Sequence, residues 1–445
     1  MKGSFIKANA LIISALNILI ITTLQGQPSV GQTEVTKWQY GRNGAVSITY
    51  DDGSINQFRK AVTIMNRLKM PGTFFINTGS IPGSKYQGKF IGRPVKDIIA
   101  ESKTIPTGKD NVYERASAAR YLGYKGTSDY FTKAGAQIDA GRDAEAYKIL
   151  DELYKKVNNG EFQPESGNAR PENKENVLTW EMVKTIAAQG HEFSSHMVTH
   201  PYMAALDEPN MLYELEKSRE EILNQLGPKY IFSAECPYGT ENERAIEYAH
   251  KVYPALRNRM PEKFLLELNR PSRKTPVAPD KEYVQWQRGA TTKTPMPMMK
   301  AWVDTTAIQK NIWLVLVIHG VDGIGWEALT SQSIDEYFQY IDSKKNELWV
   351  ATFGDVARYM RERMNSEIKS SDDKGKITVT FSHSLDKAMY NLPLTLKTYV
   401  KPEWKEVVVK QGKEVLRIRT QQSGGSTYVL YQAMPNSGNI EITGA

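Results

Sequence analysis

Two acidic residues, Asp51 and Asp52, stand side by side directly after a stretch that alternates like a β-strand. Successive side chains leave an extended chain on opposite sides, so the two carboxylates cannot both point the same way. One of them can bind a metal ion while the other faces a reacting water molecule. The sequence Asp-Asp-Gly is more often a simple turn, so this chemistry requires partners from elsewhere in the chain.

Two histidines, His196 and His200, are four residues apart. That spacing brings both imidazoles close enough in one helical turn to hold one cation. No glutamate lies between them, which distinguishes the pair from the H-E-x-x-H metalloprotease motif, and a general base must come from elsewhere. Cys236 is the sole cysteine in the sequence, so a thiolate-rich metal cage is excluded and the ligands must be His, Asp or Glu.

Two further segments carry functional groups at the ends of expected strands. Pro237 and Tyr238, followed by a glycine, come after a strand at 230–234, where rigid proline and permissive glycine can aim a backbone N–H and a ring into a cleft. His319 follows the strongly apolar strand at 313–318. Each segment alone is as consistent with a loop as with a site. Four such strand ends together carry the parts of one metal-dependent hydrolase.

The elements that must position these residues alternate between strands and helices. Residues 45–50 alternate in hydrophobicity, residues 55–68 place apolar side chains at three- and four-residue spacing, and residues 73–76 form a second apolar run. This strand–helix–strand order favours an α/β fold with parallel strands. The same alternation resumes from 180 to 363. We therefore predict a (β/α) barrel, in which active-site residues lie at the C-terminal ends of the strands.

The chain is predicted to contain two domains. The barrel spans 27–364 and carries an insertion at about 80–178, where the pattern weakens into polar sequence. The stretch 365–376 is predicted to be a polar linker. Beyond it, residues 377–445 alternate with a period of two between turn residues, which predicts a small antiparallel β-sandwich that packs on the barrel or binds glycan.

The first 26 residues have the layout of a secretory signal peptide. Lys2 and Lys7 precede an uncharged stretch, 8–24, with an apolar centre. An uncleaved anchor is the competing interpretation, because no A-x-A-like cleavage site follows. No later stretch approaches 18 consecutive apolar residues, so we expect no membrane span after signal removal. The protein is therefore expected to be exported, to the periplasm, the cell surface or the extracellular medium.

The composition restricts the class of partner. The 445 residues include 57 Lys and Arg and 50 Asp and Glu, a formal charge of +7, and 40% are hydrophobic, as in a globular protein. Basic and acidic residues are interspersed, without the long basic tract that tracks a phosphate backbone. The composition argues against nucleic acid as a partner and leaves the oligomeric state open.

Taken together, the four motifs resemble those of the polysaccharide deacetylases with a NodB-homology domain, carbohydrate esterase family 4. The resemblance covers about 45–359 apart from the insertion. The matching segments are 49–53, 195–201, 235–239 and 318–319. The resemblance implies the family's distorted (β/α) barrel and one divalent metal, Zn²⁺ in the first place, with Co²⁺ or other divalent ions as alternatives.

The resemblance also implies roles for individual residues. Asp51 would be the general base, and His319 the general acid that protonates the departing amine or alkoxide. The backbone N–H of Tyr238 would help to hold the oxyanion. The metal ligands would be Asp52, His196 and His200.

The third motif departs from the family pattern. It commonly starts with an arginine that pairs with the catalytic base, whereas this chain has Glu235 there. A second carboxylate beside Asp51 would raise the pKa of that aspartate. Either Glu235 points away, or Arg257 or Arg259 supplies the missing cation, and of the two we favour Arg257.

The family's D-x-x-D-W fourth motif is not found, so the partner that orients His319 is unassigned, with Asp304 and Asp322 as candidates. Trp326 follows His319 closely and can form a sugar-stacking wall, since aromatic faces suit the C–H surface of a pyranose, or can be part of the core. The residues assigned to substrate binding are Pro237, Tyr238, Arg257 and Trp326.

The insertion is rich in tyrosine, with helices expected near 113–122 and 143–157. Its tyrosines either line a glycan groove or serve as ordinary packing. They are Tyr86, Tyr113, Tyr121, Tyr124 and Tyr130.

The remaining reactive side chains are interpreted as structural. His191 begins a strand, His250 is a solvated helix residue, and His383 lies in the sandwich away from the barrel. Cys236 could act as a nucleophile with His319, but that would leave the Asp-His-His set unused, so it is interpreted as a small apolar filler.

The sequence thus predicts an exported, metal-dependent hydrolase that removes N-acetyl, or alternatively O-acetyl, groups from a polysaccharide or oligosaccharide. An acetyl xylan esterase uses the same chemistry on another substrate. A catalytically weak glycan-binding protein on the same scaffold is the alternative from a different class.

Overall fold

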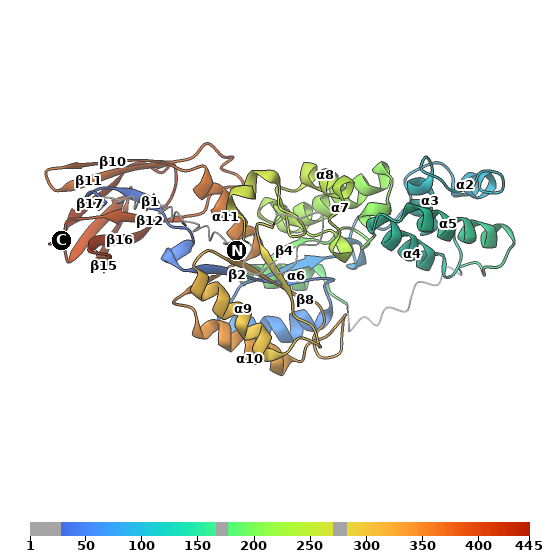
Figure 1. Ribbon diagram of the computed structural model, residues 1–445, viewed down its shortest axis with the longest axis horizontal. Helices are drawn as coiled ribbons and strands as arrows, with labels where there is room; N and C mark the ends of the chain where they lie inside the picture. Colours follow the sequence, from blue (N-terminus) through green and yellow to red (C-terminus); the bar gives the residue numbers. More distant parts are fainter. Residues whose placement is uncertain (1–27, 166–176, 270–282) are drawn as a thin grey trace, which may run out of the picture.

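The computed structural model describes residues 28–165, 177–269 and 283–445. The predicted signal peptide, 1–26, lies outside the described residues. Figure 1 shows an elongated molecule in three parts, with a β-sandwich at one end, an α/β domain in the middle and a helical module at the other end. Within the described ranges, no helix combines the length and the apolar character that crossing a bilayer requires.

Parallel strands form the central sheet, in the order β6-β5-β4-β3-β2-β8-β7, with β9 also pairing with β2. Every residue of β2 and β3 is buried, as expected for apolar strands covered on both faces. The strands are β2 (Gly44–Tyr50), β3 (Gly72–Ile76), β4 (Glu192–Ser195), β5 (Ser233–Ala234), β6 (Ala255–Leu256), β7 (Trp286–Gly289), β8 (Trp313–Ile318) and β9 (Leu348–Val350).

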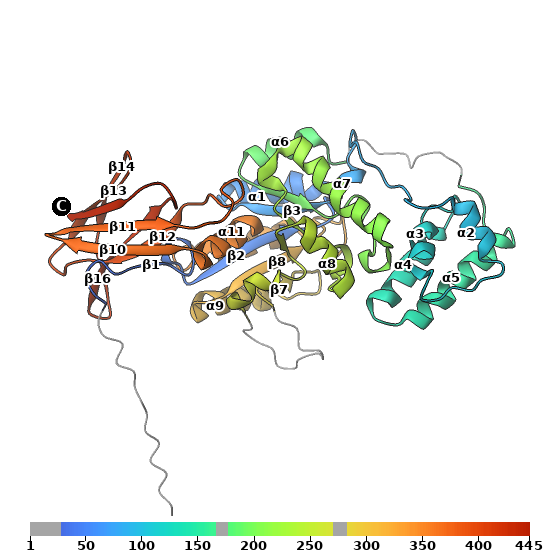
Figure 2. The same ribbon diagram turned by 90° about the horizontal axis from the view of Figure 1, so that it is seen from above.

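Helices connect these strands and cover the sheet (Figures 1 and 2). Under them, the ring of Phe74 packs against Tyr50, Phe58 and Phe193, with centroids 5.3, 5.1 and 5.4 Å away. The helices are α1 (Val62–Arg67), α6 (Trp180–Ala188), α7 (Glu208–Leu226), α8 (Glu243–Val252), α9 (Met296–Gln309), α10 (Ser331–Ser343) and α11 (Phe353–Met364). The predicted α/β fold with a distorted barrel is confirmed.

Among the described residues, no strand pairing joins the two edge strands of this sheet, β6 and β7. Side chains connect these edges instead. Gln285 and Gln287, at β7, both donate their side-chain amides to the main-chain oxygen of Arg257, which directly follows β6. The sheet is therefore an open barrel whose gap is bridged next to Arg257.

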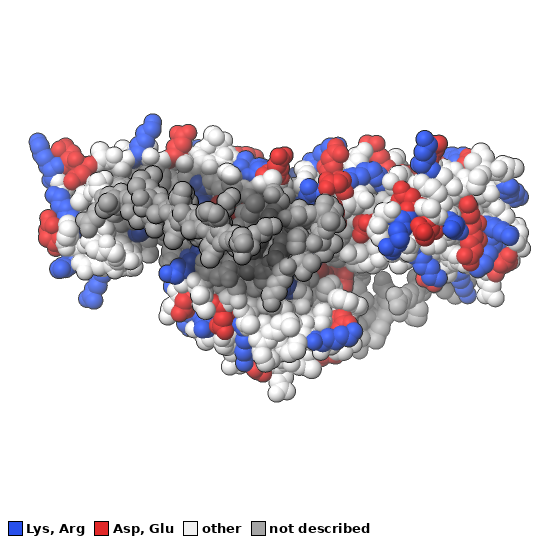
Figure 3. Space-filling view, viewed as in Figure 1, with Lys and Arg blue, Asp and Glu red and all other residues white. Residues whose placement is uncertain are grey.

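The insertion forms a separate helical module with α2 (Val95–Glu101), α3 (Val112–Ala119), α4 (Thr127–Asp139) and α5 (Asp143–Asn158). The expected helices correspond to α3 and α5, whereas α2 and α4 were not predicted. On the face shown in Figure 3, positive and negative side chains of the module are interspersed, which agrees with the absence of a basic tract in the sequence.

Two antiparallel sheets form the predicted sandwich, in the orders β1-β12-β16-β15 and β10-β11-β17-β13-β14. Their strands are β1 (Thr33–Val35), β10 (Glu367–Asp373), β11 (Lys376–Ser382), β12 (Leu394–Tyr399), β13 (Glu406–Gln411), β14 (Glu414–Arg419), β15 (Gln421–Ser423), β16 (Ser426–Ala433) and β17 (Ile440–Gly444).

The predicted domain boundaries are wrong at two places. The stretch 365–376 contains no simple linker, because β10 pairs with β11 along its whole length. Its side chains are mostly exposed, so its composition resembles a linker while its main chain completes a sheet. At the other end, β1 pairs with β12, so the segment before the barrel belongs to the sandwich and not to 27–364.

His383 also differs from its interpretation. It is buried where the sandwich meets α11, and its Nε2 lies 3.2 Å from Oε2 of Glu362. Burial raises the pKa of Glu362 to about 7 and lowers that of His383. The residue therefore joins the sandwich to the barrel.

His191, interpreted as structural, is buried beside the sheet. Its Nδ1 accepts the main-chain N–H of Gly72 at 3.0 Å, which requires a neutral ring, and its Nε2 lies 3.1 Å from Oδ1 of Asn66. Burial lowers the pKa of His191 to about 4. A group whose pKa is lower in the folded state stabilises the protein fully above its unfolded pKa, and that stability is lost as the pH falls.

We predict that the unfolding free energy of His191→Gln falls less at acid pH than that of the wild type. Between pH 7.5 and 5, protonation of His191 in the unfolded chain should cost the wild type about 2 kcal/mol of unfolding free energy that the variant does not lose. Denaturant unfolding of both proteins at the two pH values measures this difference. Equal acid losses in wild type and His191→Gln would refute it.

Candidate metal and catalytic site

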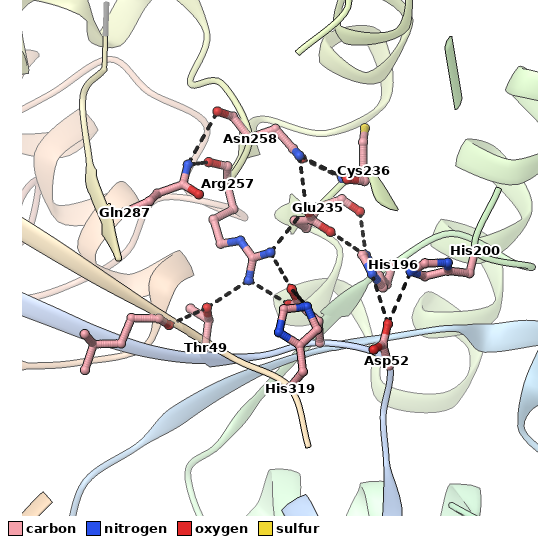
Figure 4. Close-up of polar contacts among 12 residues, drawn as sticks. Thr49, Asp52, His196, His200, Glu235, Cys236, Arg257, Asn258, Gln287 and His319 are labelled. Atoms are coloured by element: carbon pink, nitrogen blue, oxygen red, sulfur yellow. Dashed lines mark hydrogen bonds and ion pairs between the residues drawn. The ribbon is translucent and has the colours of Figure 1, made fainter. Parts of the chain in front are cut away.

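One cavity of about 590 Å³ lies at the C-terminal ends of the parallel strands. Its charged groups come from the residues that follow β2, β4, β5, β6 and β8, and Figure 4 shows them pointing toward one another. The lining residues are Asp51, Asp52, His196, His200, Tyr202, Glu235, Tyr238, Gly239, Arg257, Gln287, Val317, His319 and Trp326.

The structure brings Asp52, His196 and His200 together. Oδ1 of Asp52 lies 3.2 Å from Nε2 of His200 and 3.5 Å from Nε2 of His196. One ligand atom from each residue lies within 4.8 Å of the others. Two imidazole nitrogens and one carboxylate oxygen are a donor set that suits a catalytic zinc ion with a further open position. The residues therefore fit a divalent metal.

The backbone that presents these ligands is a turn and not the helical turn predicted from the spacing. His196 directly follows β4, and Met197 and His200 have φ angles of 68° and 56°. Asp52 is likewise left-handed, with φ 71°. Such conformations are uncommon outside glycine and persist where the surroundings hold them. The two imidazoles are nevertheless close, with ring centroids 4.7 Å apart.

Charge holds the ligand set together. Burial opposes ionisation of Asp52, but hydrogen bonds and attraction from His196 and His200 outweigh it and lower the pKa of Asp52. Burial also opposes the His196 imidazolium, yet the charge of Glu235 and hydrogen bonds with Asp52 and Glu235 raise its pKa to about 10. A cation competes with these protons, because histidine binds metal only when the coordinating nitrogen is deprotonated.

Arg257 resolves the question raised by Glu235. Its Nη1 and Nη2 each donate to Asp51 at 2.6 Å, and Nη2 also lies 3.2 Å from Oε1 of Glu235. Glu235 thus points into the site and Arg257 supplies the cation. Arg259 instead pairs with Glu243 on the surface. All three charges of the Asp51–Arg257–Glu235 group are buried, with side chains 3% exposed.

Glu235 also reaches the metal side of the cavity. Its Oε2 lies 2.6 Å from Nδ1 of His196, and its main-chain oxygen is 3.0 Å from the same nitrogen. Burial opposes ionisation of Glu235, but the charges of His196 and Arg257 lower its pKa. A carboxylate on the far nitrogen of a ligating histidine fixes the ring and its tautomer. With Nδ1 so engaged, His196 presents Nε2 to Asp52.

Asp51, His196 and Glu235 form a second group of neighbouring ligand atoms. The carboxylates of Asp51 and Glu235 already share the guanidinium of Arg257, and Glu235 contacts His196 at Nδ1. This group is therefore a charge-balanced network, whereas the Asp52 group faces the cavity with Nε2 of both histidines.

His319 lies on the other side of the cavity, with Nε2 3.3 Å from Oδ2 of Asp51. Neither aspartate suggested as its partner is engaged with it, because Asp304 accepts from Tyr340 and Asp322 accepts the main-chain N–H of Ser331. The side chain that meets His319 is Asp51 itself.

The side-chain amide of Gln57 donates to the main-chain oxygens of Asp51, at 2.5 Å, and His319, at 2.7 Å. It belongs to a π-helical turn, Gln57–Ala61, directly before α1. One buried amide thus ties together the ends of β2 and β8. No sequence signal singled out this glutamine, because it lies within the apolar helical pattern.

Aromatic side chains flank the charged groups. Tyr238, with φ 63°, lies beside His200 at a centroid distance of 4.7 Å and stacks on Tyr202 at 3.7 Å and 2°. Trp326 is 59% exposed and meets His319 edge-on at 4.7 Å, so it is a wall of the site and not part of the core. Pro237 is buried and is not among the residues that line the cavity.

Of two further residues, Tyr202 was missed by the sequence analysis and Cys236 was interpreted correctly. Tyr202 lines the cavity but was not predicted, since nothing in the sequence shows that it stacks on Tyr238. Cys236 is buried, and burial raises the pKa of its thiol. A thiol held in its protonated form is no nucleophile, so its interpretation as a filler agrees with the structure.

A protein-family model matches part of the chain. Residues 140–253 match the family model described as Polysaccharide deacetylase. The match starts after α4 and ends after α8, so it includes His196, His200 and Tyr238. The match agrees with the resemblance to polysaccharide deacetylases, and with the hydrolase class, that the motifs predicted.

Individual relatives are more distant. A gellan lyase from Bacillus sp is 25% identical over 275 residues, which are 58% of this chain and 11% of that protein. A family 4 carbohydrate esterase from Bacillus anthracis shares 12% identity, with 71% of this chain and 83% of that chain covered and a TM-score of 0.32. For the peptidoglycan deacetylase PdaC from Bacillus subtilis, the identity is 11%, the coverage 74% and 96%, and the TM-score 0.34.

We predict that His200→Ala weakens Zn²⁺ or Co²⁺ binding by at least about 100-fold, because removing a ligand should cost more than the 10–100-fold loss typical of an outer partner. Calorimetry with each ion, and the visible absorption of Co²⁺, measure the affinity without substrate. His250→Ala, which removes a histidine outside the cavity, should bind as the wild type does. Equal affinities for all three proteins would contradict a metal site here.

Proposed function

We propose that this protein is a metal-dependent deacetylase of an acetylated polysaccharide or oligosaccharide, since residues 140–253 match the model of the polysaccharide deacetylases. The observation that carries the proposal is the grouping of Asp52, His196 and His200 beside Asp51 and His319 in one cavity. That arrangement supplies metal ligands, a base and an acid around the same space.

A divalent ion, Zn²⁺ in the first place, would be held by Asp52, His196 and His200, and when bound it polarises a carbonyl oxygen and makes water more acidic. The carboxylate of Asp51 takes the proton of the attacking water. Arg257 keeps that carboxylate oriented through two parallel hydrogen bonds.

His319 supplies the proton that the leaving nitrogen or oxygen of the sugar requires. Its Nε2 lies 3.3 Å from Oδ2 of Asp51, and Figure 4 shows His319 apart from the pair His196 and His200. The backbone N–H of Tyr238 donates to the oxygen of the acetyl group as negative charge develops there. Each role needs only groups that line the same cavity.

Export is a further part of the proposal. Lys2 and Lys7 ahead of the uncharged, apolar stretch 8–24 support a signal peptide, and export to the periplasm, the cell surface or the medium would bring the enzyme to a polymeric glycan. N-terminal sequencing of the exported protein tests this point, since a mature chain beginning at Met1 contradicts cleavage.

We predict that Asp51→Asn and His319→Ala each lower acetate release by about 10²–10⁴-fold, the usual contribution of a general base or acid. The substrates are chitin oligomers and acetylated xylan, which also separate an N-deacetylase from an acetyl xylan esterase. A chelator should abolish release by the wild type, and Zn²⁺ or Co²⁺ should restore it.

His250→Ala serves as the control and should retain full activity. If the wild type loaded with Zn²⁺ or Co²⁺ releases no acetate from any glycan yet binds oligosaccharides, the alternative of a glycan-binding protein on this scaffold replaces the proposal.

A further inference from the structure

The helical module reaches the cavity through one face of α4. Gly135 and Asp139 are one helical turn apart and so lie on the same face. Gly135 packs against the ring of Tyr202, and Asp139 accepts the hydroxyl of Thr240. Figure 2 shows α3 and α4 on the side of the module that faces the barrel. One helix of the insertion therefore contacts both the segment after His200 and the segment after Tyr238.

Gly135 is required by close approach. A Cβ at this position would lie 2.6 Å from Cβ and 2.7 Å from Cγ of Tyr202, which real Cβ atoms essentially never show. In a helix interior, glycine costs about 0.8–1 kcal/mol relative to alanine. Position 135 lies in the second half of a 13-residue helix, so glycine is unfavourable for the helix itself. The absence of a Cβ at position 135 instead makes room for the side chain of Tyr202.

Tyr202 in turn supports Tyr238. The two rings are parallel within 2° at a centroid distance of 3.7 Å, so neither can shift toward the other. Tyr238 is 47% exposed, lines the cavity and lies beside His200. Its left-handed backbone, with φ 63°, persists only where neighbours hold it. A displacement of Tyr202 is therefore passed on to the ring and the backbone of Tyr238.

A second contact runs from the module to the metal ligands. Arg120, at the end of α3, donates from Nη1 to Oγ1 of Thr199 at 2.6 Å and from Nη2 to its main-chain oxygen at 3.1 Å. Thr199 directly precedes His200. Glu214, on α7, accepts the main-chain N–H of Thr199 at 2.9 Å and lies 3.9 Å from Nη1 of Arg120. The turn that presents His200 is thus held between the barrel and the insertion.

We propose that the insertion is a working part of the site, with Gly135 and Arg120 as positioning residues. Gly135 sets the Tyr202–Tyr238 stack, whose exposed face takes the pyranose ring next to the acetyl group, and Arg120 sets the metal ligand His200. The first half of this proposal, which concerns Gly135 and sugar binding, rests on the proposed function. The second half, which concerns Arg120 and metal binding, does not.

Gly135→Ala tests the first half. We expect kcat/KM for a chitin pentamer to fall at least tenfold while Co²⁺ affinity stays within twofold of the wild type. The matched control is Gly108→Ala, in the same module, where a Cβ meets nothing within 4 Å, and it should behave as the wild type. A loss of helix stability cannot mimic the effect, because alanine improves the helix.

A double-mutant cycle with Tyr202→Gly separates positioning from any other effect of the methyl group. Tyr202→Gly removes both the Cβ and the ring that a Cβ at position 135 would meet, so in that background Gly135→Ala should cause no further loss. Tyr202→Phe keeps the stacked ring and should retain activity, which also covers the case in which Gly135→Ala does not fold. Additive losses in the cycle, or full activity of Tyr202→Gly, overturn this half.

Arg120→Met tests the second half. We expect about a tenfold loss of Co²⁺ affinity, the lower end of the effect of removing a partner of a ligand. The control is Arg142→Met, which removes an exposed arginine of the module that contacts Gln137. Co²⁺ affinity equal to that of the wild type overturns this half.

The outcomes also separate the positioning proposal from the proposed function. If the wild type releases no acetate, the proposed function fails, and calorimetric binding of the chitin pentamer replaces kcat/KM in the cycle. Weaker binding by Gly135→Ala and Tyr202→Gly, but not by Tyr202→Phe, then supports the stack as a sugar platform. Binding that none of these changes alters, or no binding by any of them, overturns it.

Discussion

The cavity depends on one buried guanidinium. Arg257 meets Asp51 through two 2.6 Å hydrogen bonds and Glu235 at 3.2 Å, with all three side chains 3% exposed. Two carboxylates in one buried site repel each other, and an unpaired buried charge is strongly destabilising. An arginine is always protonated and its planar fork can meet both acids at once. Without it, neither carboxylate could be held at this depth.

The same guanidinium connects the two halves of the chemistry. Glu235 shares Arg257 with Asp51 and also lies 2.6 Å from Nδ1 of His196, whose Nε2 faces Asp52. A continuous chain of contacts thus runs from the proposed base to the proposed metal ligands. The glutamate that departs from the family pattern in sequence acts as the link, and the arginine comes from the end of the neighbouring strand, β6.

Two accessory parts attach to opposite ends of the barrel (Figure 1). The helical module reaches the cavity through α4 and through Arg120, so its attachment bears on the site. The sandwich instead meets α11, where His383 and Glu362 are buried together, and its contact lies among residues that do not line the cavity. The helical module, and not the sandwich, can therefore influence the proposed reaction, because it lies near the C-terminal ends of the parallel strands.

Much of this was accessible from local pattern alone. Apolar alternation and turn residues place Asp51, His196 and His319 at strand ends, and parallel strands bring such ends to one edge of a sheet. Spacing could not decide between Arg257 and Arg259, because that depends on which side chain faces a carboxylate on another strand. It also suggested a helical turn for the two histidines, where tertiary contacts hold a left-handed one. Strand β10 and the Tyr202–Tyr238 stack were missed for the same reason. Main-chain pairing and ring stacking are made with residues distant in the chain, and neither leaves a periodic trace in the residues that take part.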